Sequence, residues 1–264
     1  MKSNRTLWVT VSLVALAVLA VIALIVANIT RGGNDSKSAP ASQGEESNSS
    51  ATDTDSEQFK GAEADMYGRD VKLPVNEFGA ALGQAESFDS TQCEVPDNPP
   101  ATIQRTNDVE TLWSPTQGPS TVSDKGVING YSNSAEGAML SMWNTVMMVM
   151  HGGGPGDASI AELVEHGEEI MDGAEGTSRV DDRYGDWGAP DAFRIISCHD
   201  GRVIGEFAVP MPVNSKGESD KPVWSIHRGS ATWVDGVWKT DMSTQQNPNE
   251  EETYSLEGWT KWQL

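Results

Sequence analysis

The chain has 264 residues, and 18 Lys and Arg residues against 39 Asp and Glu residues give it a formal net charge of −21. Such a length allows one or two domains. The acidic balance excludes sequence-independent binding of nucleic acid, because neutralising phosphate groups requires clustered Lys and Arg residues. We therefore expect no nucleic-acid partner.

The first long apolar segment is residues 7–29, in which 20 of 23 side chains are apolar and none is charged. As an α-helix this segment is about 34 Å long and crosses a hydrocarbon core about 30 Å thick. A cleaved signal peptide has a shorter apolar region, of about 7–15 residues, followed by a small-residue cleavage site. The segment therefore predicts an uncleaved signal-anchor, a single transmembrane helix in contact with the lipid bilayer.

The flanking charges predict the orientation of this helix. Lys2 and Arg5 lie in residues 1–6, and short basic flanks stay in the cytoplasm. A long acidic domain crosses the membrane regardless of its charge. We expect a single-pass protein of the cell membrane with a cytoplasmic N-terminal stub and an extracytoplasmic C-terminal domain.

Residues 30–90 are predicted to form a disordered acidic linker. Ser, Asn, Asp, Glu, Gly and Thr dominate residues 31–65, where Phe59 is the only large apolar residue. Such a stretch buries too little apolar surface to offset the entropy lost on ordering it. In the more ambiguous residues 66–90, Val71–Val75 can form a short strand and the rest is typical of a loop.

Residues 91–264 are predicted to form the folded domain, beginning with two helices. Ser134 can cap a helix over Ala135–Met150 that is apolar around most of its circumference, so we expect this helix to be buried against a sheet. The glycine run at 152–156 ends it. A second helix follows, capped by Asp157 and closed by Gly173.

The remainder of the domain has the two-residue period of strands. Two hairpins are expected, with turns at Asp200-Gly201 and Asp235-Gly236, since both turn residues tolerate a positive φ. The predicted strands are Ala192–Cys198, Arg202–Met211, Val223–Val234, Val237–Met242 and a short strand within Leu256–Trp262. Helices packed on one face of a curved antiparallel sheet make an α+β domain.

Motifs that carry chemistry are scarce. His151-Gly152-Gly153-Gly154 matches the string of an esterase oxyanion hole, but that chemistry also needs a G-x-S-x-G nucleophile turn, which the chain lacks. We interpret this string as a helix C-terminus, where His suits the helix dipole and Gly supplies a left-handed residue.

A metal site is considered at Glu162, His166 and Glu169, which share one face of the second predicted helix. This face lies opposite the apolar side, where solvated charges belong, so a solvated surface explains it. We expect no catalytic, cofactor-binding or metal-binding residues, no cofactor and no enzymatic activity.

Eight Trp residues lie outside the apolar segment, and two uses are open to them. Trp fills the core of a lean domain, as expected of a cross-strand pair between Trp233 and Trp238. Exposed Trp side chains also bind sugar rings or proteins. The candidates for binding are Trp187, Trp259 and Trp262.

Cys93 and Cys198 are the only cysteines, and both lie on the predicted outer side of the membrane. An oxidising compartment permits a disulfide between them, which closes a loop of about 105 residues. The alternative is two free thiols that pack as small apolar groups. We expect the disulfide.

Four short motifs carry a resemblance: Gly118-Pro119, Gly130-Tyr131, Ser134-Ala135-Glu136-Gly137-Ala138 and Trp233-Val234-Asp235-Gly236-Val237-Trp238. With them, residues 93–264 resemble the ectodomains of a family of uncharacterised membrane-anchored actinobacterial proteins. The order of helices and curved sheet resembles the NTF2-like domains of VirB8-type and TcpC-type conjugation components. The resemblance implies an NTF2-like fold and a part in a conjugation or secretion apparatus.

Two functional hypotheses follow. The first is a non-enzymatic, membrane-anchored interaction or assembly module whose partners are envelope, secretion or conjugation proteins. The alternative is an extracytoplasmic protein that binds cell-wall glycan through exposed Trp residues. A hydrolase is a third hypothesis, because the cone-shaped interior of an NTF2-like domain can host catalysis between its helix and its sheet. The oligomeric state is left open.

Overall fold

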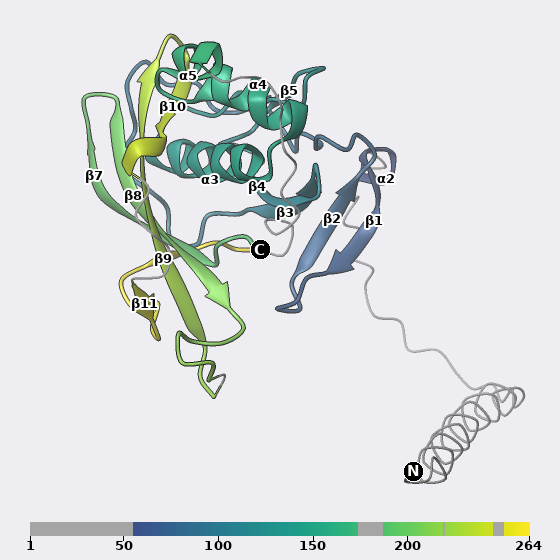
Figure 1. Ribbon diagram of the computed structural model, residues 1–264, viewed down its shortest axis with the longest axis vertical. Helices are drawn as coiled ribbons and strands as arrows, with labels where there is room; N and C mark the ends of the chain where they lie inside the picture. The colour runs from purple at the N-terminus through teal and green to yellow at the C-terminus, as the bar shows by residue number, and fades with distance from the viewer. Residues whose placement is uncertain (1–54, 174–186, 219, 245–250) are drawn as a thin grey trace, which may run out of the picture. The chain divides into compact units, whose positions relative to one another are not determined.

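The computed structural model describes residues 55–173, 187–218, 220–244 and 251–264 (Figure 1). The predicted cytoplasmic stub, the apolar segment 7–29 and the linker up to residue 54 lie outside these ranges. Among the helices described, none combines the length and the apolar character needed to cross a membrane. The described part is a mixed α+β domain, as the sequence predicts.

The smaller sheet has four strands in the order β1-β2-β3-β4. A short helix, α2 (Asp55–Gln58), leads into it. Pairing is antiparallel except between β2 and β3, which run parallel. The strands are β1 (Phe59–Ala64), β2 (Asp70–Pro74), β3 (Thr102–Thr106) and β4 (Val109–Trp113).

The larger sheet is antiparallel, in the order β10-β9-β8-β7-β12, with β11 paired to β9. Both predicted hairpins are confirmed, and Asp200, Gly201, Asp235 and Gly236 all have positive φ. The strands are β7 (Ala192–His199), β8 (Arg202–Met211), β9 (Val223–Val234), β10 (Val237–Asp241), β11 (Glu252–Thr253) and β12 (Thr260–Lys261). A small hairpin, β5 (Thr121–Val122) and β6 (Ile128–Asn129), and the 3-10 turn η2 (Met242–Thr244) complete the strand-rich part.

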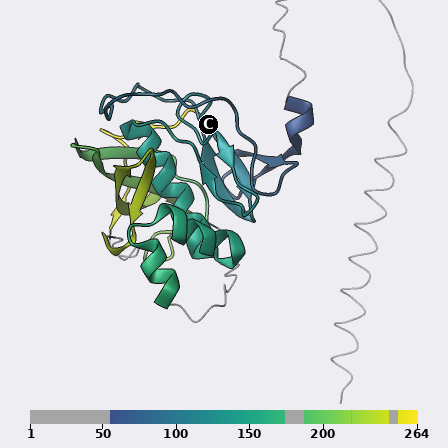
Figure 2. The ribbon, with the colours of Figure 1, turned by 90° about the horizontal axis from the view of Figure 1, so that it is seen from above.

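Helix α3 (Ala135–His151) lies between the two sheets, as Figures 1 and 2 both show. The predicted N-cap is confirmed, since the Ser134 hydroxyl accepts a hydrogen bond from the Gly137 amide at 2.9 Å. Fourteen of the helix's residues are buried. The expectation of a single sheet was incomplete: the helix is apolar around its circumference because it contacts one sheet on each side.

The two sides of α3 meet their sheets differently. On the smaller sheet, Asn144 accepts a hydrogen bond from the Leu112 amide and donates one to the Leu112 carbonyl, each 2.8 Å long. The Trp143 indole donates to the Glu110 carbonyl at 3.0 Å. These side chains occupy backbone groups on the edge of β4 where another strand would pair, so α3 closes that edge.

On the larger sheet, two glycines make room for the helix. Gly205 of β8 and Gly229 of β9 are direct partners across the strands. A Cβ at Gly205 would lie 2.3 Å from the sulfur of Met139, and one at Gly229 would lie 3.3 Å from the sulfur of Met142. The missing side chains form a hollow that the two thioethers fill. Core packing is thus confirmed for Met139, Met142, Met147 and Met148, whereas Met150 in the last turn of α3 is 36% exposed.

The prediction of a second helix capped by Asp157 and continuous to Gly173 was wrong in its start and in its continuity. Helix α4 (Gly153–Leu163) begins within the glycine run, directly after Gly152 turns the chain with φ of 85°, and Asp157 lies inside it rather than at its start. It ends where Val164 forms a bridge with Thr240 of β10. A separate helix, α5 (Gly167–Gly173), follows. The helix is interrupted at Val164 because the backbone there pairs with the edge of β10.

The predicted linker of residues 30–90 extends too far. Strands β1 and β2 lie within it, and β2 pairs with β3 through Val71, which is fully buried. Five of the six β1 residues are exposed, so this edge strand carries no apolar alternation that a sequence pattern can detect. The folded domain therefore begins well before the predicted boundary at residue 91.

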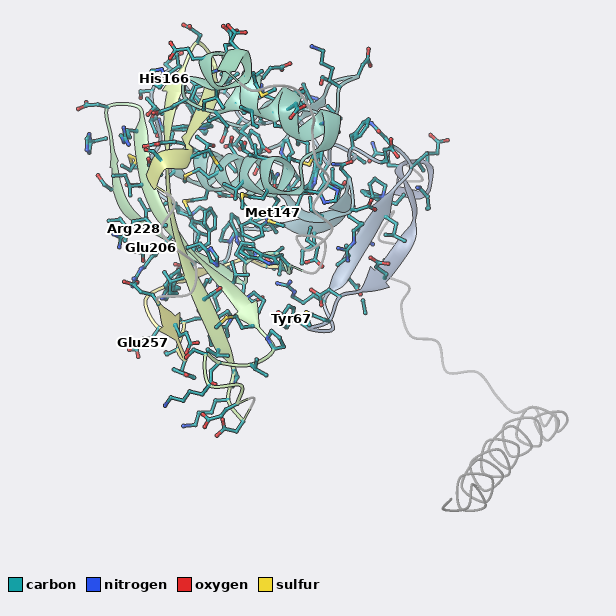
Figure 3. All side chains as sticks on the ribbon, viewed as in Figure 1. Tyr67, Met147, His166, Glu206, Arg228 and Glu257 are labelled. Atoms are coloured by element: carbon teal, nitrogen blue, oxygen red, sulfur yellow. A yellow bond between two sulfur atoms is a disulfide. The ribbon has the colours of Figure 1, made fainter. Side chains whose placement is uncertain are left out.

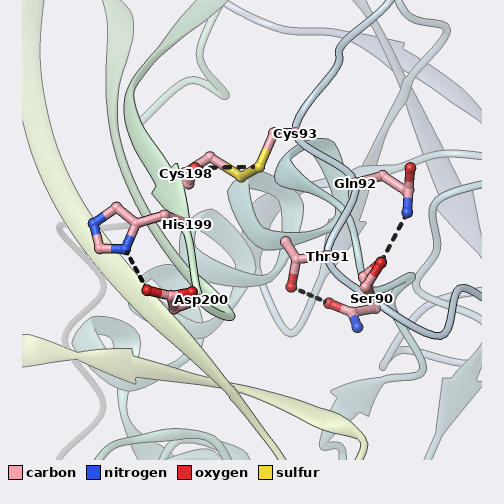
Figure 4. Close-up of a disulfide and its surroundings, with 8 residues drawn as sticks. Ser90, Thr91, Gln92, Cys93, Cys198, His199 and Asp200 are labelled. Carbon is pink, nitrogen blue, oxygen red and sulfur yellow. Dashed lines mark hydrogen bonds and ion pairs between the residues drawn. A yellow bond between two sulfur atoms is a disulfide. The ribbon is translucent and has the colours of Figure 1, made fainter.

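The predicted disulfide between Cys93 and Cys198 is confirmed, with a Cα–Cα distance of 5.7 Å (Figure 4). Cys198 lies near the end of β7, and Cys93 lies in the long segment between β2 and β3. The bond joins that segment to the larger sheet and closes a loop of 105 residues, which constrains the unfolded chain.

Alanine substitutions at Gly137 and Gly154 test how closely the start of α3 packs against the preceding loop. A Cβ at Gly137 would lie 2.4 Å from the Ser132 carbonyl oxygen, a backbone atom, whereas nothing lies within 4 Å of one at Gly154. We predict that Gly137→Ala lowers the free energy of unfolding by about 1–3 kcal/mol through overpacking, although Ala normally favours a helix. Gly154→Ala is expected to be neutral or stabilising, by up to about 1 kcal/mol. Urea unfolding of the full-length protein measures both, and equal effects would contradict this account.

Glu136, in the first turn of α3, predicts a dependence of stability on pH. It is 4% exposed, one carboxylate oxygen has no hydrogen-bond partner among the described residues, and burial raises its pKa to about 7. The folded state thus keeps a proton that the unfolded state releases above about pH 4.5, so stability falls as the pH rises from there to about 7.

The variant Glu136→Gln removes this titration. At pH 8 we expect it to raise the free energy of unfolding by as much as about 3 kcal/mol, with a much smaller change at pH 4.5. Urea unfolding at both pH values is the measurement, with the exposed Glu257→Gln as control. A variant that is destabilised at pH 8 would refute the assignment.

Candidate functional site

A cleft of about 740 Å³ lies where the ends of the two sheets approach one another. One wall comes from the β1–β2 turn, with Met66 and Tyr67, and the opposite wall from the ends of β8 and β9, with Met211 and His227. Figure 3 shows Tyr67 at the end of the smaller sheet, beside the larger one. Trp187 lines the cleft as well. We refer to this space as the intersheet cleft.

Arg69 organises the base of one wall. Its guanidinium forms ion pairs with Asp65 at 2.7 Å, with Asp191 at 2.7 Å and with Glu110 at 3.3 Å. It also donates to the Ala189 carbonyl at 2.6 Å and lies 5.3 Å from the centre of the Tyr67 ring. One side chain therefore joins the β1–β2 turn to β4 and to the segment that leads into β7.

Glu110 lies at the bottom of the cleft with a side chain only 4% exposed. Burial raises its pKa, while a hydrogen bond from the Ala189 amide and the charges of Arg69 and Arg105 act in the opposite direction. Both carboxylate oxygens accept hydrogen bonds: Oε2 from the Ala189 amide at 2.8 Å and Oε1 from Arg105 at 3.3 Å. Burial is the larger effect, so the pKa of Glu110 stays above its ordinary value, and the two oxygens act as acceptors that hold the wall together.

His227 and Ser225 form a second polar group in the cleft. The His227 Nε2 atom and the Ser225 Oγ atom are 2.8 Å apart, and the Trp187 ring meets the imidazole edge-on at 5.3 Å. Burial lowers the pKa of His227 to about 4, so the ring is neutral at neutral pH. Among the described residues, His227 contacts a hydroxyl and an indole but no carboxylate. The pair of Ser225 and His227 therefore lacks, within these residues, the carboxylate that completes a catalytic triad.

The three Trp candidates lie in three different environments. Trp187 lines the cleft, whereas Trp259 lies against the guanidinium of Arg194, at 4.5 Å. Trp262 is 6% exposed and packs on Phe193 with ring centres 4.4 Å apart. The expectation of a binding role for Trp262 was therefore wrong, since it is a core residue. The expected pairing of Trp233 with Trp238 is confirmed, with ring centres 5.2 Å apart.

The other sequence candidates do not form a site. His151 is buried in the last turn of α3, and Gly152 follows with positive φ, as the C-cap interpretation predicts. Glu162 and Glu169 lie on different helices, because His166 takes a left-handed φ of 58° between them. Within the described ranges, no three His, Cys, Asp or Glu side chains are grouped so as to hold a metal ion.

Sequence reasoning missed most of the cleft. Met66 and Tyr67 fall in the segment predicted as linker, and His227 lies in a predicted strand with no motif around it. The Tyr67 hydroxyl donates to the Pro210 carbonyl at 2.7 Å across 143 positions of sequence. Asp, Tyr and Arg at positions 65, 67 and 69 are the one local signal, and they indicate only a polar turn.

Comparison with known proteins identifies the family. The sequence profile of the family described as Domain of unknown function (DUF8175) matches residues 72–261, and the chain belongs to this family. No curated protein and no solved structure matches the chain. The matched range covers β3 to β12 and most of β2, hence most of the intersheet cleft.

The variant Arg69→Met tests how much the ion pairs of Arg69 in the cleft wall contribute to stability. The change leaves three carboxylates without their shared cation in a largely buried position, and we expect it to lower the free energy of unfolding by about 3–5 kcal/mol. The control is Arg194→Met on the larger sheet. Arg194 is 43% exposed, and its partner Glu206 retains Arg228, so its loss is expected to cost less than about 1 kcal/mol. Thermal unfolding compares the two variants, and similar losses would argue against a central role for Arg69.

Proposed function

We propose that this protein is a single-pass, membrane-anchored, extracytoplasmic interaction module that binds a partner protein in the intersheet cleft. The apolar run at 7–29, preceded by Lys2 and Arg5, supports the anchor and its orientation. The Cys93–Cys198 disulfide supports an oxidising location for the domain.

The composition of the cleft is the observation that carries the proposal. Its lining includes Trp, Tyr, Met and Arg, the residue types that are enriched at protein interfaces. Met66 is 62% exposed at the rim, and the neighbouring Val213 beyond Pro212 is 41% exposed. An exposed apolar rim around an aromatic cleft suits a protein partner, because a small molecule would leave that rim in water.

The polar groups of the cleft favour binding over catalysis. The carboxylates of Asp65 and Glu110 are occupied by guanidinium and amide donors, which leaves neither as a general acid. His227 is paired with Ser225, and no carboxylate within the described part of the chain orients it. The proposal is therefore a non-enzymatic module.

The proposed partners are envelope, secretion or conjugation proteins. The support is an arrangement in which a buried helix packs on an antiparallel sheet behind a single N-terminal anchor, which is how NTF2-like VirB8-type and TcpC-type components are built. The support is a similarity of architecture alone. A place in a conjugation or secretion apparatus is accordingly the proposed setting of the module.

One observation favours a second candidate, binding of cell-wall glycan. Trp187 lines the same cleft as Arg105 and Glu63, and sugar rings bind to aromatic faces flanked by planar polar side chains. With Trp262 in the core, this candidate depends on Trp187 rather than on a row of three Trp residues.

Site-specific photocrosslinking in intact cells tests the proposal. A photoreactive amino acid replaces Met66 at the rim of the cleft, and in a control it replaces Val75, which is 57% exposed and does not line the cleft. We expect a discrete protein adduct from position 66 that position 75 does not give, and mass spectrometry then identifies the partner.

Two outcomes would contradict the proposal. Equal adducts from both positions would mean that the cleft is not the docking site. The absence of an adduct from either position would refute the proposal of a protein partner. Retention of the protein on purified cell-wall glycan, lost in Trp187→Ala and retained in Trp259→Ala, would support the glycan candidate instead.

A further inference from the structure

The charges around the intersheet cleft do not balance. Of the described charged side chains that line it or lie directly behind it, four are carboxylates and two are guanidinium groups, joined in one network. His227 adds no charge, since burial lowers its pKa to about 4. Carboxylates therefore outnumber cations here, in a chain whose net charge is −21. The carboxylates are Glu63, Asp65, Glu110 and Asp191, and the cations are Arg69 and Arg105.

Glu63 is the carboxylate that a ligand can reach. Its side chain is 45% exposed, whereas those of Asp65 and Glu110 are 2% and 4% exposed. Arg105 contacts Glu63 through Oε1, at 2.9 Å from Nη2 and 3.0 Å from Nε. Neither contact uses Oε2, so this rim carboxylate has an oxygen available to a second cation.

The walls beside Glu63 suit the stem of a long cationic side chain. Tyr67 already accepts a guanidinium against its ring in the contact with Arg69. Trp187 offers a second aromatic ring in the same cleft, and Met66 and Met211 supply adaptable apolar surface. Lys and Arg place methylene groups on such surfaces and keep the charge at the rim.

The backbone at the end of β8 disfavours strand addition on that wall of the cleft. Pro210 and Pro212 lack amide hydrogens, and the Pro210 carbonyl already accepts the Tyr67 hydroxyl. A partner backbone therefore finds few groups to pair with there, which favours recognition through side chains that enter the cleft.

We infer that the intersheet cleft receives a Lys or Arg side chain of a partner protein, with its charge at Glu63 and its stem between Tyr67 and Trp187. This inference rests on the proposed function and specifies the chemistry of the partner. Apolar residues next to the cation in the partner sequence contact Met66, Met211 and Pro212. The binding segment of the partner is thus basic and apolar in alternation, which complements an acidic module.

Selection from a random heptapeptide phage library tests the inference, with the full-length protein in lipid nanodiscs as bait and empty nanodiscs as the counter-selection. We expect enriched peptides to carry Lys or Arg beside an apolar residue. The affinity of a synthetic enriched peptide is expected to fall about three- to tenfold in Glu63→Gln and to fall with added salt. Glu257→Gln removes the same charge elsewhere on the surface, away from Tyr67 in Figure 3, and is expected to leave the affinity unchanged.

Thermal unfolding first confirms that both variants are folded. Enrichment of acidic or uncharged peptides, equal loss in the two variants, or no enrichment over empty nanodiscs would overturn the inference. The photocrosslinking at position 66 distinguishes failure of the cationic ligand from failure of the interaction module. A specific adduct with a partner whose crosslinked segment lacks Lys and Arg would refute the cationic ligand and leave the interaction module standing, whereas the absence of an adduct refutes both.

Discussion

Two hydrogen bonds between the Asn144 amide and the backbone of Leu112 set the arrangement of the domain. They place α3 against the edge of the smaller sheet, and the Gly205 and Gly229 pair lets the opposite side of the helix sink into the larger sheet. The helix thus has no solvent-facing stripe over most of its length. An α-helix enclosed in this way must carry small or apolar side chains all round, which explains the Met-rich sequence of α3.

Because α3 holds the two sheets apart, the space beyond it becomes the intersheet cleft. The cleft is closed at its base by Arg69, which draws together carboxylates from β4, from the β1–β2 turn and from the segment before β7. A buried network of this kind keeps its charges only while its geometry is complete. The same carboxylates line the cleft or lie directly behind it, so the stability of the domain and the acidic character of the cleft depend on the same residues.

A domain of this construction suits the interaction module that we propose. Its wall residues come from elements that are braced by a disulfide, by ion pairs and by packing, so the cleft is formed before a partner arrives. Preorganisation lowers the entropy lost on binding and favours recognition by a few anchoring side chains. The match to the family described as Domain of unknown function (DUF8175) covers residues 72–261, which include the cleft wall from β8 and β9. Glu63, Met66 and Tyr67 of the opposite wall precede the matched range.

The sequence by itself determined the local features of this protein. Ser134 as the cap of α3, the positive φ of Asp235-Gly236 and the alternation along β7 to β10 each depend on residues within a few positions, so pattern reasoning predicted them. The two cysteines predicted the disulfide because no other pairing exists.

Only the tertiary structure decided which polar and aromatic residues meet. Strand β1 is exposed along most of its length and carries no period, so its place in a sheet depends on β2 and β3. Tyr67 reaches Pro210, Glu110 reaches Ala189, and Trp262 enters the core through contact with Phe193. These partners are separated by tens to more than a hundred positions, and such contacts are determined by the packing of whole elements rather than by local propensity.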